Sequence, residues 1–251
     1  MQIQIISDLH LEFMKKLPKF LKYFKKTANY LFLAGDIGYP QYSQYNRGIF
    51  YEFICWCTDN YKKVFYIIGN HEAYDSDLIN VRESLKKISE EKQNFIFLEK
   101  GVIAECEGYK VIGCTLWSDI ESEAYYNMND RYNIKIKGQN LERIDLIKMH
   151  KEDRKWLEEN VDNNTIVMTH HLPSYSLIHK DYRTENFIKY ESGYASNLDE
   201  IIYNAALWIY GHTHKSSDIM FDGITRCICN PHGYHNDDDY MSGFTTNVFE
   251  I

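Results

Sequence analysis

The stretch NYLFLAGD, residues 29–36, contains a five-residue apolar run that ends in Gly-Asp. A run of that length suits a β-strand and falls far short of the roughly 20 residues that span a bilayer. Similar runs lie on either side of it, IQIIS at 3–7 and KVFYIIGN at 63–70. We therefore predict three strands in the first 70 residues.

Segments with a helical pattern separate and follow these strands. Residues 18–26 begin with a proline and carry a helical face, and residues 42–61 form a longer helical stretch. A third helix is predicted to begin after Asp77, a residue type favoured at helix N-caps. One face of that helix is apolar: Leu78, Val81, Leu85 and Ile88. Strands that alternate with helices predict an α/β sheet that is mainly parallel in this half of the chain.

From about residue 95 the pattern changes to short strands without long helices between them. The segment 118–150 is polar and rich in tyrosine, and we predict a partly helical insertion or cap there. A helix at 150–160 leads into the strand TIVMTHH at 165–171, and the C-terminal part is mostly β, with a hairpin turn at FDGI. Because no repeat or linker is visible, a single domain over residues 1–251 is expected.

The composition is that of a soluble globular protein, with 44% hydrophobic and 25% charged residues. No secretory signal is visible, and a residue assigned to chemistry at position 8 leaves no room for one, so a cytoplasmic protein without a membrane segment is expected. The six cysteines lack C-x-x-C spacing and are expected to be reduced and structural. A net charge of −8 argues against binding of duplex nucleic acid.

Each of five apolar strands ends in a residue that can bind a metal ion. These residues are Asp8, His10, Asp36, Asn70, His170, His212 and His214. In open α/β sheets, ligands bind at the carboxyl ends of the strands. Taken singly, each residue has an ordinary alternative; Asp36 and Asn70, for example, could be turn residues. Their occurrence at every strand end favours a site.

The type of ligand indicates the type of metal. Aspartate, histidine and asparagine without cysteine suit divalent ions such as Mn, Fe, Zn or Co. Seven candidates are too many for one ion and about right for two ions that share a carboxylate, a clamp for displacement at phosphorus. His212 and His214 are expected to be extended, with both rings on one face and each ring serving a different ion.

The motifs DLH, GD, GNHE, THH and GHTH resemble, in kind and order, those of the calcineurin-like metallophosphoesterases, from residue 5 to about 234. The resemblance implies a four-layer α/β/β/α sandwich of two mixed sheets flanked by helices. It also implies one ion held by Asp8, His10, Asp36 and His214. The second ion would be held by Asp36, Asn70, His170 and His212, with Asp36 bridging.

The same resemblance implies a mechanism. A hydroxide between the two metals would attack phosphorus, and His71 would contact the phosphate and protonate the leaving oxygen. Asp36 and His71 are therefore the expected catalytic residues. Glu72 stands where many members have aspartate, and either residue can orient His71. GDIGYPQ lacks the arginine that protein serine/threonine phosphatases carry at that place, which argues against a protein phosphatase.

Four further positions carry weaker expectations. RCICNPHGY resembles the NPRGY-like segment of a subgroup of small stand-alone phosphoesterases, with His232 in place of the arginine. His232 either faces the substrate or closes a turn. Arg131, in the predicted cap, is our choice for a substrate phosphate contact beside Asn70 and His71. His171 should pack with its side chain directed away from His170. The acidic segment 236–240 is expected to be a solvated loop.

Together these features predict a metal-dependent phosphoesterase with two divalent ions, Mn, Fe or Zn. Its partner would be a small phosphorylated substrate, a phosphomonoester or phosphodiester, of which a nucleotide is one candidate. A nuclease or cyclic-nucleotide phosphodiesterase is the alternative enzyme, and a non-catalytic protein-binding scaffold is the alternative outside enzymes. The presence of His71 and all seven candidate ligands favours the enzyme.

Overall fold

The structure is a computed structural model that describes residues 1–17, 21, 26–40, 48–234 and 243–251. Most of the predicted helix at 18–26, the beginning of the one predicted at 42–61, and the acidic segment 236–240 lie outside the described residues. In the described part of the chain, no helix is long and apolar enough to cross a membrane.

The first sheet contains the three strands predicted near the N-terminus. Its order is β14–β1–β2–β3–β5, and β1, β2, β3 and β5 are parallel while β14 is antiparallel. The strands are β1 (Gln2–Ile6), β2 (Tyr30–Ala34), β3 (Lys63–Ile67), β5 (Phe95–Phe97) and β14 (Phe249–Glu250). β2 is buried at all five positions, which is why it reads as an unbroken apolar run.

The second sheet is built from the later strands in the order β12–β13–β11–β10–β7–β6. They are β6 (Ala104–Cys106), β7 (Tyr109–Cys114), β10 (Thr165–Thr169), β11 (Leu207–Tyr210), β12 (Ser217–Phe221) and β13 (Thr225–Cys229). The four inner strands are parallel, and the two edge strands are antiparallel. β12 and β13 pair up to Phe221 and Thr225, so the predicted hairpin at FDGI is confirmed.

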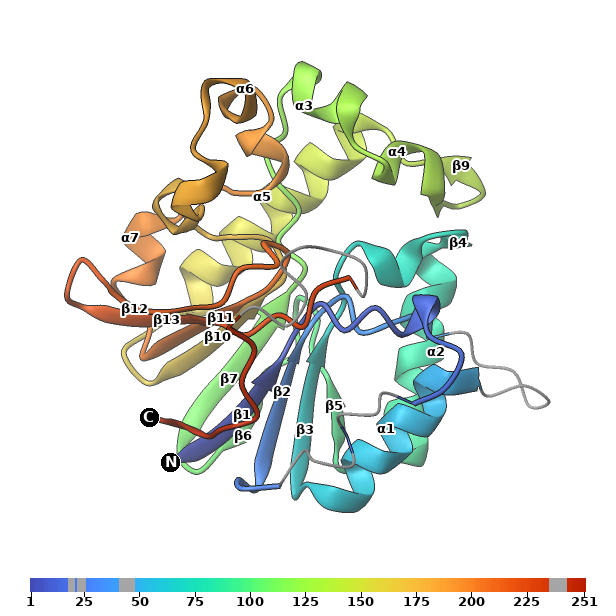
Figure 1. Ribbon diagram of the computed structural model, residues 1–251, viewed down its shortest axis with the longest axis vertical. Coiled ribbons are helices and arrows are strands. Elements are labelled where there is room, and N and C mark those ends of the chain that lie inside the picture. Colours follow the sequence, from blue (N-terminus) through green and yellow to red (C-terminus); the bar gives the residue numbers. More distant parts are fainter. Residues whose placement is uncertain (18–20, 22–25, 41–47, 235–242) are drawn as a thin grey trace.

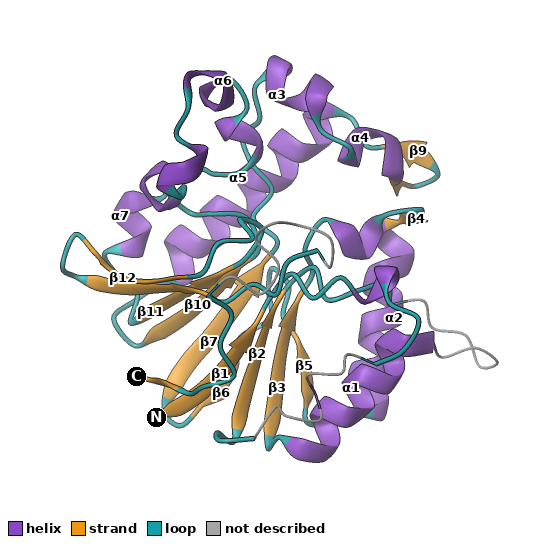
Figure 2. Cartoon of the chain, viewed as in Figure 1, coloured by secondary structure: helices purple, strands orange, loops and turns teal. Residues whose placement is uncertain are grey.

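The two sheets pack face to face, with helices on both outer faces (Figures 1 and 2). Ile5, Phe32 and Phe65 of the first sheet meet Ile166 and Ile209 of the second in one buried cluster. Helices α1 (Gly48–Asn60) and α2 (Leu78–Glu91) cover the first sheet, and α5 (Arg143–Asn160) and α7 (Asp199–Ile202) cover the second. The predicted four-layer sandwich is therefore confirmed.

Helix α2 forms as its sequence pattern predicts. The Asp77 carboxylate accepts a hydrogen bond from Ile79 N at 2.9 Å, and the four apolar residues of one face are buried. Helix α5 begins at Arg143 instead of residue 150. A capping box between Glu142 and Asp145 satisfies free amides at the start of the helix, and this signal lies within the predicted insertion.

Two groups of short elements lie above the carboxyl ends of the strands (Figure 1). The first falls in the predicted insertion and contains α3 (Ser122–Asn127), α4 (Asp130–Asn133), β8 (Ile134–Ile136) and β9 (Gln139–Asn140). β8 and β9 form a small third sheet with β4 (Ser76–Asp77). The second spans residues 175–193, which the sequence pattern left unassigned, and consists of helical turns and α6 (Glu185–Ile188).

Candidate metal centre

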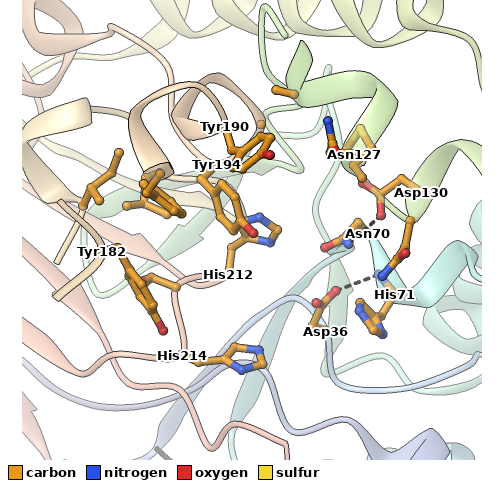
Figure 3. A pocket seen from close by; sticks show the side chains of 18 of the residues that line it. Asp36, Asn70, His71, Asn127, Asp130, Tyr182, Tyr190, Tyr194, His212 and His214 are labelled. Atoms are coloured by element: carbon orange, nitrogen blue, oxygen red, sulfur yellow. Dashed lines mark hydrogen bonds between the residues drawn. The ribbon is translucent and has the colours of Figure 1, made fainter. Parts of the chain in front are cut away.

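The parallel strands of both sheets end on the same side of the sandwich, and the seven candidate ligands meet there. Asp8, Asp36 and Asn70 come from the first sheet, and His170 and His212 come from the second. Their donor atoms fall into overlapping groups in which every pair lies within 4.8 Å: Asp8, His10 and His214; His10, Asp36 and His71; Asp36, His170 and His212. Figure 3 shows part of this arrangement from the cavity side.

The first group gathers around two imidazole nitrogens. His10 Nε2 lies 3.1 Å from His214 Nε2, and His214 Nε2 lies 3.6 Å from Asp8 Oδ1. Asp8 Oδ1 accepts a hydrogen bond from His212 N, whereas Asp8 Oδ2 is buried without a hydrogen-bond partner among the described residues. A buried carboxylate oxygen left unpaired is energetically costly. This position therefore suits a cation.

The group of Asp36, His170 and His212 is oriented by a backbone contact. The His170 Nδ1 atom lies 2.9 Å from Ala34 O, which directs Nε2 toward Asp36 Oδ2 at 3.3 Å and Asn70 Oδ1 at 3.2 Å. Burial lowers the pKa of His170, but the Asp36 carboxylate outweighs it and raises the pKa to about 10. An imidazole held in this way by a carbonyl is a common arrangement for a metal ligand.

Asp36 lies between His10, which belongs to the group with Asp8 and His214, and His170, which belongs to the group with His212. Its Oδ2 is 3.3 Å from His170 Nε2 and 3.9 Å from His10 Nε2, while its Oδ1 accepts a hydrogen bond from His71 N at 2.8 Å. One oxygen therefore faces histidines of both groups. Carboxylate, imidazole and amide donors without a thiol fit two borderline-hard divalent ions that share Asp36.

The backbone at these positions is unusual. Asp8, His10, Asp36, His212 and His214 all have positive φ, between 50° and 68°. Our expectation that residues 212–214 are extended is therefore wrong. β11 ends at Tyr210, and two left-handed residues then place His212 and His214 in different groups. Strained backbone of this kind is characteristic of functional sites.

Two glycines allow these loops to approach one another. A Cβ atom on Gly69 would lie 2.1 Å from Asp36 Oδ1, and one on Gly35 would lie 2.5 Å from His170 Nδ1. Both distances are far below van der Waals contact. The glycines in the GD and GN motifs therefore leave the space in which the ligand side chains lie.

Glu72 does not orient His71, so that part of the sequence interpretation is wrong. Its carboxylate points into the protein and accepts hydrogen bonds from Asp36 N, Ile37 N, Gly69 N and the Tyr66 hydroxyl, at 2.7–3.0 Å. Burial, together with the Asp36 carboxylate, raises the pKa of Glu72 to about 7. Glu72 holds together the loops that follow β2 and β3.

Glu12, and not Glu72, contacts the ring of His71. Its Oε1 lies 3.1 Å from His71 Nδ1 and 2.9 Å from His10 Nδ1, and the Glu12 side chain is 3% exposed. His71 Nε2 faces the other way and lies 2.8 Å from the Tyr234 hydroxyl. Burial lowers the pKa of His71, but Asp36 and Glu12 outweigh it and raise the pKa to about 8. The sequence signal for Glu12 was a carboxylate two residues after His10.

The predicted insertion reaches the site through Asp130. Asn70 Nδ2 donates to Asp130 Oδ1 at 2.9 Å, and the Tyr74 hydroxyl donates to the same oxygen at 2.6 Å. These bonds turn the amide oxygen of Asn70 toward His170. The neighbouring Arg131 lies 4.1 Å from the centre of the Tyr132 ring and does not line the cavity described below, so its predicted phosphate contact is not made in this arrangement.

Two further histidines are packed inside the protein. His232 is 1% exposed and does not line the cavity described below, and His232 N donates to Ser7 O, which ties this segment to the end of β1. The ring of His171 lies 4.3 Å from that of His212 and 5.5 Å from that of His170. It packs as expected but does not point away from His170, because β10 ends at Thr169 and the strand alternation ends there.

A cavity of about 530 Å³ opens above these side chains (Figure 3). Asp36, Asn70, His71, His212 and His214 are among the residues that line it. Its volume lies in the range typical of sites for small molecules. These four candidate ligands and His71 are therefore accessible to a small substrate.

Two packed mixed sheets with clustered candidate metal ligands beneath a cavity are the arrangement expected of a metal-dependent hydrolase. The chain belongs to the calcineurin-like phosphoesterase family, whose sequence profile matches residues 1–216, and is thus a metal-dependent phosphoester hydrolase. An uncharacterized protein of Acanthamoeba polyphaga mimivirus, L509, is 30% identical to it over 259 residues, which cover 88% of each chain.

Solved structures share the fold at low sequence identity. A phosphopantetheinyl hydrolase from Mycobacterium tuberculosis is similar with a TM-score of 0.67 and 16% identity, over 93% of this chain and 89% of that one. The protein TT1561 of Thermus thermophilus is similar with a TM-score of 0.57 and 12% identity, over 92% and 88%. At these identities, the likeness shows the fold alone.

Proposed function

We propose that the protein hydrolyses a small phosphomonoester or phosphodiester with the help of two divalent ions. The observation that supports this most is the position of Asp36, whose Oδ2 faces His10 and His170 of two ligand groups beneath one cavity. Asp8, His10, Asp36 and His214 would hold one ion. Asp36, Asn70, His170 and His212 would hold the other.

Bound divalent ions would supply Lewis-acid stabilisation of charge at phosphorus and would lower the pKa of water toward 7. The ligand residues do not have to move far for this, because the left-handed loops and the contacts of Glu72 and Asp130 already hold them in place. A preorganised site avoids the cost of reorganisation during the reaction.

His71 would donate the proton to the leaving oxygen. Glu12 accepts the Nδ1 proton of His71, so the ring presents Nε2 toward the cavity and the Tyr234 hydroxyl. Before ions bind, Asp36 and Glu12 raise the pKa of the ring to about 8, so it carries a second proton at neutral pH, and that proton lies at Nε2. This is the charge state that a general acid requires.

A paired assay tests the proposal. The protein, loaded separately with Mn²⁺, Zn²⁺ and Fe²⁺, is given an aryl phosphomonoester and the matching bis-aryl diester, with His71→Ala as control. We expect metal-dependent hydrolysis of one ester type and a loss of about 10²- to 10⁴-fold in the variant. Inactivity with all three metals on a broad phosphoester panel would overturn the proposed function. Full activity of His71→Ala would overturn only its role as the acid.

A further inference from the structure

The cavity has two walls that differ in chemistry (Figure 3). One wall is formed by residues 178–194, and the other by residues 124–130 at α3 and α4. The candidate metal ligands and His71 lie between them at the floor. A reacting phosphoryl group belongs at the floor, so the walls would contact the remainder of the substrate.

The wall formed by residues 178–194 is a continuous row of aromatic rings. The ring centres of Tyr182 and Phe187 are 5.6 Å apart, and those of Phe187 and Tyr194 are 5.0 Å apart. The row continues to the floor, because the Tyr194 ring lies 5.0 Å from that of His212. Tyr190 lines the same wall. Aromatic rings that line a cavity can contact a planar group by offset stacking or edge to face.

The opposite wall offers hydrogen-bonding groups and a flexible apolar side chain. Asn127 and Asn129 present carboxamides, and Met128 lies between them in the sequence. Carboxamides both donate and accept hydrogen bonds, which suits the polar edge of a ring better than a purely hydrocarbon group. A planar group stacked on the aromatic wall would turn its edge toward these amides.

The walls present no unpaired positive charge to the cavity among the described residues. Among the described residues, none that lines the cavity is a lysine or an arginine, and Asp130 adds a carboxylate. Lys215, beside His214, lies 3.3 Å from Asp181, and Arg131 lies against the Tyr132 ring. Bound ions would add positive charge at the floor, where the reacting phosphoryl group lies. The cations that the structure places beside the walls already pair with carboxylates: Lys189, 4.9 Å from the centre of the Tyr190 ring, with Glu123, and Lys215, 5.7 Å from the centre of the Tyr182 ring, with Asp181. A second phosphate or a carboxylate on the leaving group would compete with those carboxylates.

From these features, and resting on the proposed function, we infer that the alcohol side of the substrate carries a planar, uncharged ring. The ring stacks on Tyr194 and Phe187, and the substrate has no negative charge beyond the reacting phosphoryl group. Nucleobases and simple aryl groups share this chemistry. Polyphosphates and sugar bisphosphates do not.

Matched substrates test the ring without changing the reaction. Benzyl phosphate and cyclohexylmethyl phosphate have similar alkyl leaving groups and differ in the planarity of the ring. Adenosine 5′-monophosphate and ribose 5-phosphate share a primary alcohol and differ in the nucleobase. Methyl diesters of the same alcohols replace the monoesters if the first assay identifies a diesterase. We expect kcat/KM to be about tenfold to hundredfold higher for the ring-bearing member of a pair, mainly through KM.

Variants of one aromatic residue test the wall. Tyr194→Leu should remove most of the preference for the ring, whereas Tyr194→Phe should retain the preference. Tyr126→Leu is the control, since Tyr126 is 63% exposed on α3 and does not line the cavity. 4-Carboxybenzyl phosphate should be a poorer substrate than benzyl phosphate because it adds a negative charge.

The outcomes separate this inference from the proposed function. Equal kcat/KM within both pairs, a ring preference that survives in Tyr194→Leu, or preference for 4-carboxybenzyl phosphate would overturn the inference and leave the phosphoesterase function standing. A ring preference in the nucleotide pair alone would identify the ring as a nucleobase, and a preference in the benzyl pair alone would identify it as an aryl group. If no ester is hydrolysed with any metal, the proposed function fails and the inference fails with it.

Discussion

At the residue scale, the site depends on carboxylates with different tasks. Asp36 faces both ligand groups, Glu72 fixes two loops through backbone amides, and Glu12 contacts the rings of His10 and His71. Residue type alone could not separate these tasks, because all three are acids close to a motif residue. The separation arises from where each side chain points.

Glu12 offers the sharpest test at this scale. In Glu12→Gln the accepting carboxylate becomes a neutral amide, so His71 is held less firmly in the protonated state. We expect kcat to fall about tenfold to hundredfold for a phenyl ester and less for a p-nitrophenyl ester, whose leaving oxygen needs little protonation. Measuring kcat and KM for both esters, together with bound metal, checks this.

Metal content is the control for this variant, because Glu12 also contacts His10. An equal loss of kcat for both esters with a full complement of metal would show that Glu12 does not act through His71. If kcat falls only in proportion to the bound metal, Glu12 acts through its contact with His10 instead.

At the scale of elements, the loops that follow the strands lie unusually close to one another. The loop after β3 passes so near the loop after β2 that Gly69 has no room for a side chain, although its own φ is not positive. The five apolar strands could be predicted because each shows as an apolar run. The short helical turns at 175–193 could not, since they are held by tertiary contacts rather than by a repeating pattern.

Gly69→Ala should displace the Asp36 carboxylate and reduce metal binding while the sheets still form. We expect bound metal per protein to fall severalfold, as measured by elemental analysis, with an unchanged far-UV circular dichroism spectrum. Gly108→Ala is the matched control. Its φ is 88° and nothing lies within 4 Å of the added Cβ, so it should lower stability by about 1 kcal/mol and keep the metal. Full metal binding by Gly69→Ala would contradict the steric argument.

Helix α5 contains a buried acid whose ionisation should act on stability. Burial raises the pKa of Asp153 to about 6, against an ordinary value of 3.8. Between these two values the folded protein retains a proton that the unfolded chain releases, so stability falls as pH rises and the loss is complete above about pH 6. The shift corresponds to an upper bound of about 3 kcal/mol.

Asp153→Asn should remove this dependence. The free energy of unfolding of the variant minus that of the unchanged protein should be more positive at pH 7.5 than at pH 4. Urea unfolding at several pH values measures this difference. Asp59→Asn, on α1, is a comparison acid in another helix. If the difference in free energy of unfolding between Asp153→Asn and the unchanged protein does not vary with pH, the carboxyl is not protonated in the folded state.

At the scale of the whole molecule, the candidate metal centre joins the two sheets. Asp8 and Asp36 follow strands of the first sheet, and His170 and His212 follow strands of the second. Ions bound between them would crosslink the sandwich at one end. Ions that bind only the folded protein must also stabilise it.

Saturating Mn²⁺ or Zn²⁺ should therefore raise Tm above its value in a chelator. An ion at 100 times its Kd adds about 2.7 kcal/mol, which corresponds to a rise of roughly 5–10 °C for a chain of this size. A thermal-shift titration measures it, and His170→Asn, which removes a ligand from the second sheet, should reduce the rise. An equal rise in His170→Asn would place the bound ion elsewhere.

By itself, the sequence determined the alternation of strands and helices, the strand ends at which ligands occur, and the family motifs, because apolar runs and short motifs are local signals. It also sufficed to assign His212 and His214 to different groups of candidate ligands, although the predicted extended geometry was wrong. Only the tertiary structure decided that Glu12 rather than Glu72 faces His71, that Asp130 rather than Arg131 reaches the site, and that residues 178–194 form an aromatic wall. Those relations join segments far apart in the chain, and their geometry depends on left-handed loops and packing that no local pattern records.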